Sequence, residues 1–447
     1  MATTLKTEDS IPSVTDKLSL FALPPTETGV EKKYYVNYRP VSQLIDDCSP
    51  IEFSFNGATD LVDLKETELH VRAKIVNSTG APVKEEECVA PANLLLHSMF
   101  EKVDLNIQGK SMTHAMGGYP YMSYFKTMRC LGADNNHMEA IGFKLDSQDM
   151  DASGLMPLED PSDPNGKRKF NIGAAHRGRW FFNGQTFEMQ GPLLADVCDL
   201  PRYLLNNTEV AIKLFRSRPE FVLSALNPST GYKLLLEEIY LRVAFVKPTP
   251  GVLLGMAKTL EAGHKAFYPY TRTEVRSFNI PENYQDICLD NIFQDIVPSL
   301  VMVGLLDSQA KNGSYEKNCF NFQPYDVKEI GLSVDGSYVP SRPLQVDFSN
   351  GQNFVGAYKN FMSCLRSNAD DVGVDMELYK NGYTLFTFNL QNEGEEDPQK
   401  NLSLMKHGSV RLELRFGKKL PHTVSLVVYA EYPSLFTIDK ARRVEVL

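Results

Sequence analysis

The stretch YFKTMRCLG, residues 124–132, is echoed by AYKNFMSCLRS, residues 357–367. In both, an aromatic residue and a lysine precede Met, one intervening residue, Cys and Leu, with one residue inserted in the second copy. Apolar side chains recur at helical spacing in both copies: Tyr121, Tyr124, Phe125 and Met128, then Phe354, Tyr358, Phe361, Met362 and Leu365. Pro120 suits a first helical turn. We expect two amphipathic helices of about three turns, with Cys130 and Cys364 as small core residues rather than nucleophiles.

Alternating strands flank both helices in one order. VDLNIQG (103–109) and IGLSVDG (330–336) precede them. The segments that follow are EVAIKLFRS (209–217) and IYLRVAFVKP (239–248) in the first copy, and SVRLELRFG (409–417) and VSLVVYAEYP (424–433) in the second. Period-two alternation is typical of antiparallel sheets with one buried face. Four elements recurring in one order indicate a duplicated domain, so we predict an all-β chain of two similar sandwiches.

The offset between the copies locates their difference and the domain boundaries. It shrinks from 227 residues (330 − 103) to 185 (424 − 239), so the first copy carries longer loops after its helix. KPTPGVLLG, residues 247–255, has the prolines and glycines of a linker. The predicted divisions are an N-terminal arm at 1–45, a first domain at 46–249, a linker at 250–257, a second domain at 258–440 and a tail at 441–447. The arm either wraps its own sandwich or crosses to a neighbouring subunit.

The bulk composition excludes several classes of protein. The net charge of −10 over 447 residues argues against a basic nucleic-acid-binding groove. The sequence contains no run of 18 apolar residues, so we expect no membrane-spanning helix, and the N-terminus lacks the apolar core of a secretory signal. Seven cysteines without a CxxC pair indicate free thiols in a reducing compartment.

One acidic stretch partly matches a calcium-binding loop. In DMDASGLMPLED, residues 149–160, Asp149, Asp151 and Ser153 occupy early ligand positions. The twelfth position is Asp160 rather than the bidentate Glu, and the flanks show no clear pair of helices. A solvated acidic loop is therefore the favoured interpretation, with calcium as a weak alternative, and we expect no cofactor.

A basic cluster, KRKFNIGAAHRGRW at residues 167–180, ends in the only tryptophan. It allows two interpretations, an anion or nucleic-acid contact and a loop at a subunit interface. Because Trp and Arg are enriched at interfaces, we favour the second. The predicted interface residues are Arg177, Arg179, Trp180, Phe181 and Phe182.

Catalytic signatures are missing from the sequence. The eight histidines are scattered without HxH, HxxxH or HExxH spacing, and neither G-x-S-x-G nor a kinase-like motif occurs. A glycosidase would need two facing carboxylates, whereas Glu237 and Glu238 are adjacent on a strand and point to opposite faces. We expect a chain that is not an enzyme.

Two similar sandwiches, each with a short inserted helix, resemble the double jelly-roll major capsid proteins of double-stranded DNA viruses. The segment LPHTVSLVVYAEYPSLFTIDKARRV (420–444) is similar to the closing strand and tail of that family. PIEFSFNG (50–57) with DLVDLKETELHVRAKIVN (60–77) resembles its first strands, and LLADVCDLPRYLLNNTEVAIKLFRS (193–217) resembles the late strands of its first roll. These stretches of sequence look closest to the capsid proteins of Polinton/Maverick and adintovirus-like elements, which also lie integrated in animal genomes.

The resemblance implies two tandem jelly rolls and a structural role. It implies a homotrimer that forms a pseudo-hexagonal, hexon-type capsomer of an icosahedral shell. Neighbouring capsomers and penton or minor capsid proteins would be its partners, without sequence-specific nucleic-acid binding. Its location would be the virion capsid, assembled inside the host cell. Host, compartment, shell size and an inner membrane stay open. The alternatives are a minor or penton-type capsid protein, a domesticated capsid homologue and a carbohydrate-binding sandwich.

Overall fold

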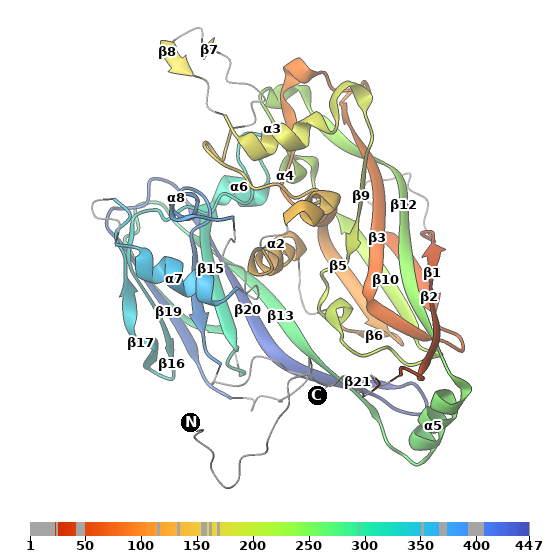
Figure 1. Cartoon of the computed structure of the whole chain (residues 1–447). Helices are drawn as coiled ribbons and strands as arrows, with labels where there is room; N and C mark the ends of the chain where they lie inside the picture. Colours follow the sequence, from red (N-terminus) through yellow and green to blue (C-terminus); the bar gives the residue numbers. More distant parts are fainter. Residues whose placement is uncertain are drawn as a thin grey trace, which may run out of the picture.

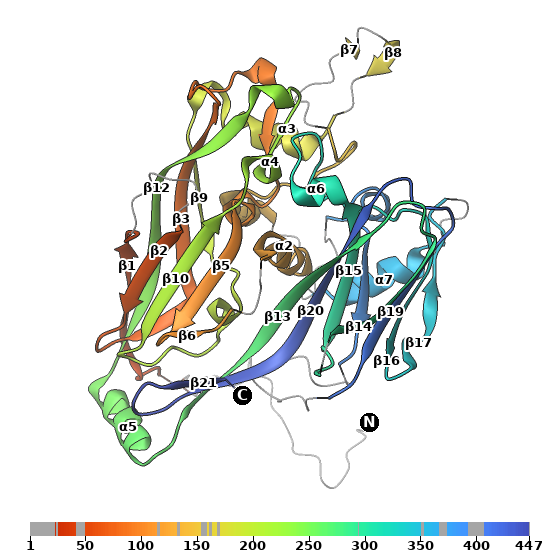
Figure 2. The ribbon, with the colours of Figure 1, turned by 180° about the vertical axis from the view of Figure 1, so that it is seen from behind.

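The computed structural model describes two β-sandwiches that lie side by side, with the helix α2 (Tyr119–Arg129) between them (Figure 1). The described residues are 23, 26–41, 50–113, 117–131, 135–152, 159–160, 163–167, 170–293, 295–349, 353–365, 373–391 and 406–446. Figure 2 shows the same two sandwiches from behind, with α2 again between them. No helix in these ranges is long and apolar enough to cross a membrane.

The first sandwich consists of two four-stranded antiparallel sheets, β1-β12-β3-β9 and β2-β10-β5-β6. Their strands are β1 (Val30–Tyr38), β2 (Ile51–Asn56), β3 (Leu61–Asn77), β5 (Phe100–Ile107), β6 (Lys110–Ser111), β9 (Phe187–Pro192), β10 (Glu209–Arg216) and β12 (Tyr232–Pro248). Two small strand pairs are added, β4 (Val89–Pro91) with β11 (Leu223–Ala225) and β7 (Glu159–Asp160) with β8 (Asp163–Lys167).

The second sandwich repeats this plan with the sheets β13-β20-β15-β18 and β14-β19-β16-β17. Its strands are β13 (Ala266–Ile280), β14 (Asp286–Phe293), β15 (Leu300–Asp307), β16 (Val327–Val334), β17 (Ser337–Gln345), β18 (Leu385–Asn389), β19 (Val410–Phe416) and β20 (Val424–Ile438), with β21 (Val444–Val446) paired to β20.

Strand order identifies both sandwiches as jelly rolls. When the eight main strands of each are ranked along the chain, one sheet has the order first–eighth–third–sixth and the other second–seventh–fourth–fifth. This arrangement is that of a jelly roll, in which two Greek keys place the first and last strands side by side. The two sandwiches share the order completely, so the predicted fold of two tandem jelly rolls is confirmed.

The repeated pattern of a strand that ends in Gly, at β5 and again at β16, has a local structural cause. β5 and β6 are joined by Gln108 and Gly109, with φ of 50° and 73°, while β16 and β17 are joined by Asp335 and Gly336, with φ of 49° and 82°. Two-residue hairpin loops with positive φ at both positions match the twist of antiparallel strands and favour Gly at the second position. The same hairpin therefore joins the fourth and fifth strands of each roll.

Both predicted helices are present and follow the fifth strand of their rolls. They are α2 and α7 (Val355–Ser363). The remaining helices are α1 (Leu95–Ser98), α3 (Ile172–Arg179), α4 (Pro219–Val222), α5 (Pro250–Glu261), α6 (Ser308–Asn312) and α8 (Met376–Lys380). Short 3-10 turns are η2 (Glu85–Glu87), η3 (Asn135–Ile141), η4 (Phe182–Gly184), η5 (Asp196–Asp199) and η6 (Pro228–Thr230). The prediction for Cys364 is confirmed, whereas Cys130 is exposed, because α2 ends beside it.

The structure differs from the sequence-based divisions at two places, the predicted arm and the predicted tail. β1, inside the segment assigned to an arm, pairs with β12, so residues 30–38 belong to a sheet of the first roll. The segment assigned to a linker lies in α5, which connects the two rolls. β21, in the segment assigned to a tail, extends the sheet of β20. Weak period-two patterning in VEKKYYVNY hid β1, because that strand exposes most of its residues.

Candidate functional site

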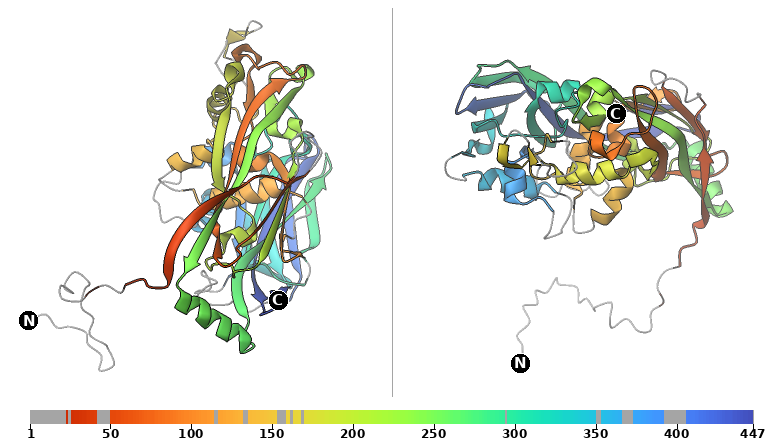
Figure 3. Two further views of the ribbon diagram at one scale, coloured as in Figure 1. Left: turned by 90° about the vertical axis from the view of Figure 1, so that its right-hand side faces the viewer. Right: turned by 90° about the horizontal axis from the view of Figure 1, so that it is seen from above.

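The seam between the rolls is built around α2. Nine of its eleven residues are buried, from Tyr119 to Met128. In Figure 3, seen from above, the two rolls stand next to each other, and the seam runs between them. A helix with polar residues in its sequence is buried this fully only when neighbours cover all of its faces. The first roll supplies one set of neighbours, and the second roll supplies the other.

Aromatic rings form the apolar centre of the seam. Tyr124 of α2 stacks on Phe320 of the second roll, with ring centroids 4.3 Å apart and planes inclined by 4°. Phe125 lies 5.6 Å from Phe322 and stacks on Tyr429 of β20 at 5.4 Å. Such pairs contribute roughly 0.5–1.5 kcal/mol each beyond the burial of their area. The predicted apolar stripe of α2 is therefore confirmed as buried, and its partner is the other roll.

Charged groups at the edge of this aromatic centre join the two rolls. Arg129 of α2 forms an ion pair with Glu431 of β20; the side chain of Glu431 is buried, and that of Arg129 is 12% exposed. Glu431 also accepts a hydrogen bond of 2.6 Å from the hydroxyl of Tyr429. Arg129 Nε donates to the carbonyl of Cys364, 3.2 Å away. A buried charge is strongly destabilising without its partner, so this pair fixes the position of α2 against β20.

Asp196 of η5 forms a second polar link. Its carboxylate accepts hydrogen bonds from Lys126 Nζ (2.7 Å) and from the backbone N–H and hydroxyl of Thr273 on β13 (2.8 and 2.6 Å). One carboxylate thus ties α2 and η5 of the first roll to the first strand of the second. Further along, Arg442 Nε donates to the carbonyl of Asn206 at 2.8 Å.

A third link lies at the end of the seam near α3. Arg177 and Asp146 form a buried ion pair of 2.8 Å within the first roll. Asp146 also accepts from Asn318 Nδ2 (3.1 Å), and its backbone carbonyl accepts from the hydroxyl of Tyr383 (2.9 Å), both in the second roll. Burial and the charge of Asp146 hold the pKa of Tyr383 well above its usual range, so this hydroxyl stays a donor.

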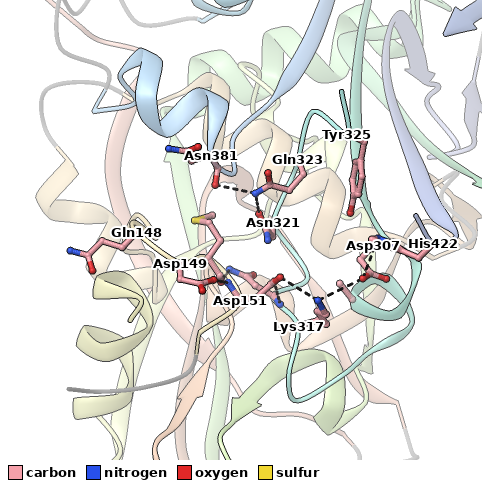
Figure 4. Close-up of a pocket in the computed structure, with 13 residues that line it drawn as sticks. Gln148, Asp149, Asp151, Asp307, Lys317, Asn321, Gln323, Tyr325, Asn381 and His422 are labelled. Atoms are coloured by element: carbon pink, nitrogen blue, oxygen red, sulfur yellow. Dashed lines mark hydrogen bonds and ion pairs between the residues drawn. The ribbon is translucent and has the colours of Figure 1, made fainter. Parts of the chain in front are cut away.

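A polar cavity of about 500 Å³ opens beside this link (Figure 4). Lys317 Nζ lies between two carboxylates in it, 3.6 Å from Asp151 and 3.8 Å from Asp307. The carboxylate of Asp307 also lies 3.5 Å from His422 Nε2. The lysine ammonium occupies the position between the acidic groups where a cation would otherwise be held.

Only two of the four residues of the weak calcium-binding candidate can be described in the structure. Asp149 and Asp151 line the cavity, and Asp149 Oδ1 accepts from the backbone N–H of Asp151 (3.2 Å). Asp151 Oδ1 accepts from the backbone N–H of Asn318. Ser153 and the side chain of Asp160 lie outside the described residues. Within the described part of the chain, no group of three or more His, Cys, Asp or Glu side chains is placed to hold a metal ion.

The predicted interface cluster is mostly interior. Arg177 and Phe181 are 2% and 1% exposed, and Phe182 is also buried. Trp180 stacks on Phe187 of β9 at 4.4 Å, which leaves it half-buried. Three of the five residues are thus packed inside this chain: Arg177 lies on α3, and Phe181 and Phe182 follow it at the start of η4. The interface prediction is corrected to Arg179 and Trp180, for which it stays a prediction.

Sequence reasoning missed the residues that join the rolls. Glu431 was the one with a visible signal, since a carboxylate in the apolar run of VSLVVYAEYP needs a buried partner. Asp146 and Asp196 lie in loops with ordinary acidic surroundings, and nothing in the sequence separates them from solvated residues. His97 of α1 is buried beside α2, its Nδ1 2.9 Å from the hydroxyl of Tyr119, and burial lowers its pKa to about 3.

Comparisons with known proteins were made on sequence and on structure. No family model matches the chain. An uncharacterized protein of Caenorhabditis elegans is 27% identical over 441 residues, covering 94% of this chain and 98% of the relative.

Among solved structures, a chain of the Sputnik virophage matches with a TM-score of 0.62 at 12% identity, covering 98% of this chain and 93% of that chain. The mavirus major capsid protein matches at 0.53 and 12% identity, covering 100% and 97%. The Faustovirus major capsid protein matches at 0.52 and 11% identity, covering 95% and 94%. At these identities the likeness shows the fold, which is the double jelly roll of viral major capsid proteins.

Proposed function

We propose that this chain is the major subunit of an icosahedral capsid and is not an enzyme. The observation that carries the proposal is the complete repetition of strand order in two rolls joined by a buried seam. Two matched rolls per chain give a trimer six similar sides, which allows it to tile a hexagonal lattice as a hexon-type capsomer. The matches to the mavirus and Faustovirus major capsid proteins along nearly the whole chain support the same role.

The expected partners follow from that arrangement. A trimer in a lattice contacts neighbouring capsomers at its sides and a penton or minor capsid protein at the fivefold positions. The chain would reside in the virion capsid after assembly inside a host cell. We place the first roll at 46–249 with the addition of β1, and the second at 258–440 with the addition of β21. The rest of the segment before β1 is proposed as the arm that ties subunits together.

Two alternatives are less well supported. A penton-type protein is usually one jelly roll that forms pentamers, and this chain has two. A carbohydrate-binding sandwich would present aromatic platforms, whereas the only tryptophan, Trp180, stacks on Phe187 within the chain.

The second candidate that an observation favours is a capsid homologue retained in an animal genome. The relative in Caenorhabditis elegans, alike along 98% of its own length, supports that origin. We also propose that the chain is related to Polinton/Maverick or adintovirus-like elements, on the resemblance of its sequence to their capsid proteins. The major-capsid fold and a cellular origin are compatible, because an integrated copy can keep the fold.

The test is the mass of the purified full chain. Light scattering combined with size exclusion should give three chains per particle, and electron microscopy of the same fraction should show pseudo-hexagonal particles. A single chain at high concentration, without ring-like particles, would overturn the proposal. A pentamer would support the penton alternative instead.

A further inference from the structure

We propose that a second cavity in the seam, beside the first turn of α2, binds a small organic anion with an apolar tail, such as an aliphatic carboxylate. The cavity has a volume of about 310 Å³ and shares no lining residue with the polar cavity beside Lys317. Among the elements that line it are α2 and α4 of the first roll and α6, β13 and β20 of the second (Figure 2). This site goes beyond the capsid role and does not depend on it.

The walls of this cavity are largely apolar. They are formed by Pro120 and Tyr121 of α2, Phe221 of α4, Val275 of β13 and Val427 of β20. Ligand sites typically have volumes of about 300–1,000 Å³, with apolar walls and a few placed polar groups. A volume of about 310 Å³ is roughly that of ten water molecules in the liquid, so a ligand of about ten non-hydrogen atoms fits. The walls therefore suit a short aliphatic chain.

Two cationic side chains line the cavity, one from each roll. Arg218 donates from Nη2 to the backbone carbonyl of Asn312, 2.9 Å away, and Lys311 Nζ donates to the hydroxyl of Ser277 at 2.6 Å. Neither cation forms an ion pair with a carboxylate in the part of the chain that the structure describes. Burial lowers the pKa of Lys311, because no carboxylate offsets the loss of water around its ammonium. A bound carboxylate would supply the missing counter-charge through charge-assisted hydrogen bonds.

The N-terminus of α2 adds partial positive charge at the same place. Gly117 and Gly118 line the cavity, and Gly118 is the N-cap residue, which offers no side chain to cap the helix. The first N–H groups of a helix have no acceptor within it, and they favour an anion. Tyr121 and Ser217 also line the cavity, and their hydroxyls are buried without a hydrogen-bond partner among the described residues. Buried polar groups without partners are uncommon and are consistent with a ligand that completes their bonding.

The charge of the lining favours a monoanion over a cation. Arg218 and Lys311 contribute +2 and Glu101 of β5 contributes −1, so the net charge is +1. The polar cavity of Figure 4 has the opposite character, because its lining carries three aspartates and one lysine. Since Arg218 belongs to the first roll and Lys311 to the second, an anion held by both would link the rolls. Binding should therefore raise the melting temperature of the chain.

Calorimetric titration of the full-length chain with octanoate tests the site. Octanoate, with about ten non-hydrogen atoms, matches the volume of the cavity. We expect saturable binding of one octanoate per chain, with acetate and 1-octanol each weaker by about tenfold or more, because one lacks the tail and the other lacks the charge. Titrations with no saturable binding of octanoate would overturn the proposal. Acetate or inorganic phosphate binding as tightly as octanoate would also overturn it, because the apolar walls would then contribute nothing.

Variants of the two cations provide the second arm. Lys311→Gln and Arg218→Gln, made separately, should each weaken octanoate binding by about tenfold or more, because each removes a charge-assisted hydrogen bond. The matched control is Lys258→Gln on the exposed side of α5, which should bind octanoate like the wild type. Melting temperatures without ligand check that each variant is folded. Wild-type affinity in both Lys311→Gln and Arg218→Gln would overturn the proposal.

Photolabelling locates the bound ligand. An aliphatic carboxylate that carries a diazirine on its tail is irradiated with the full-length chain, and mass spectrometry identifies the labelled peptides. We expect labels on peptides that contain Phe221 or Val275, and excess octanoate should suppress them. Labels confined to other peptides would overturn the proposal. None of these measurements requires a trimer, so a wild type that sediments as one chain would overturn the proposed function and leave this inference intact.

Discussion

The helices α2 and α7 are copies whose surroundings have diverged. In the shared order Met, one residue, Cys, the intervening residue is Arg129 in α2 and Ser363 in α7. Arg129 reaches Glu431 inside the seam, whereas Ser363 is exposed and donates only to the carbonyl of Asn360 in its own helix. The duplication kept the residues that anchor each helix to a roll, and the change at this one position follows what covers the helix.

The largest effect should come from the ion pair that only α2 makes. Glu431→Gln should lower the free energy of unfolding by about 3 kcal/mol, because it leaves the largely buried charge of Arg129 without its carboxylate partner. Urea denaturation measures the loss. Ser363→Ala, at the matching position of α7, should change stability by less than about 0.5 kcal/mol. Equal losses in the two variants would remove the distinction between the helices.

Lowering the pH should destabilise the surroundings of α2 before those of α7. His97 beside Tyr119 has a pKa lowered from 6.5 to about 3, so its neutral form stabilises the fold above pH 6.5 and that contribution is lost as pH falls. The slope is about 1.4 kcal/mol per pH unit, or roughly 2 kcal/mol by pH 5. His97→Gln should flatten the dependence of the urea midpoint on pH between 6.5 and 5. An unchanged slope in the variant would exclude this histidine as the cause.

The matched lysines Lys126 and Lys359 should also differ in their contribution to stability, with the larger contribution at α2. Lys126→Ala removes the ammonium from buried Asp196 and should cost about 1.5 kcal/mol, the usual worth of a hydrogen bond to a charged group. Lys359→Ala, on the exposed face of α7, should stay within about 0.5 kcal/mol at concentrations where the chain is monomeric. Denaturant titration of both variants measures the difference, and a larger loss for Lys359→Ala would contradict it.

The hairpin turns should show that the copies have not diverged everywhere. Gly109→Ala and Gly336→Ala should each cost about 1 kcal/mol, because both glycines have positive φ and no crowding atoms within 4 Å. The control is Gly356→Ala within α7, where helix propensity predicts a gain of up to about 1 kcal/mol. Unequal losses for the two turns, measured by thermal unfolding, would show that the hairpins differ in context.

Strands and helices with a clear periodic pattern could be predicted from the sequence. The alternation in SVRLELRFG buries Val410, Leu412, Leu414 and Phe416, and the stripe of α2 was located because period and spacing act over a few residues. β1 was not found, since VEKKYYVNY exposes most of its side chains and owes its place to β12.

The contacts of the seam between the two rolls could not be predicted from the sequence, for a different reason. Arg129 and Glu431 are 302 residues apart, and no periodicity connects them. The basic cluster suggested a surface because Arg and Trp favour interfaces, but α3 directs Arg177 toward Asp146 inside the chain. Long-range pairing of charges depends on the assembled fold, which local patterns do not encode.

The long separation of α2 and β20 along the sequence also determines the delay between their synthesis on the ribosome. Translation at roughly 5–20 residues per second means that β20 leaves the ribosome about 15–60 seconds after α2. During that interval the aromatic rings of Tyr124 and Phe125 have no second roll to pack against. A nascent chain therefore exposes the apolar face of α2 for about 15–60 seconds, and chaperone occupancy should rise when α2 emerges and fall when β20 arrives.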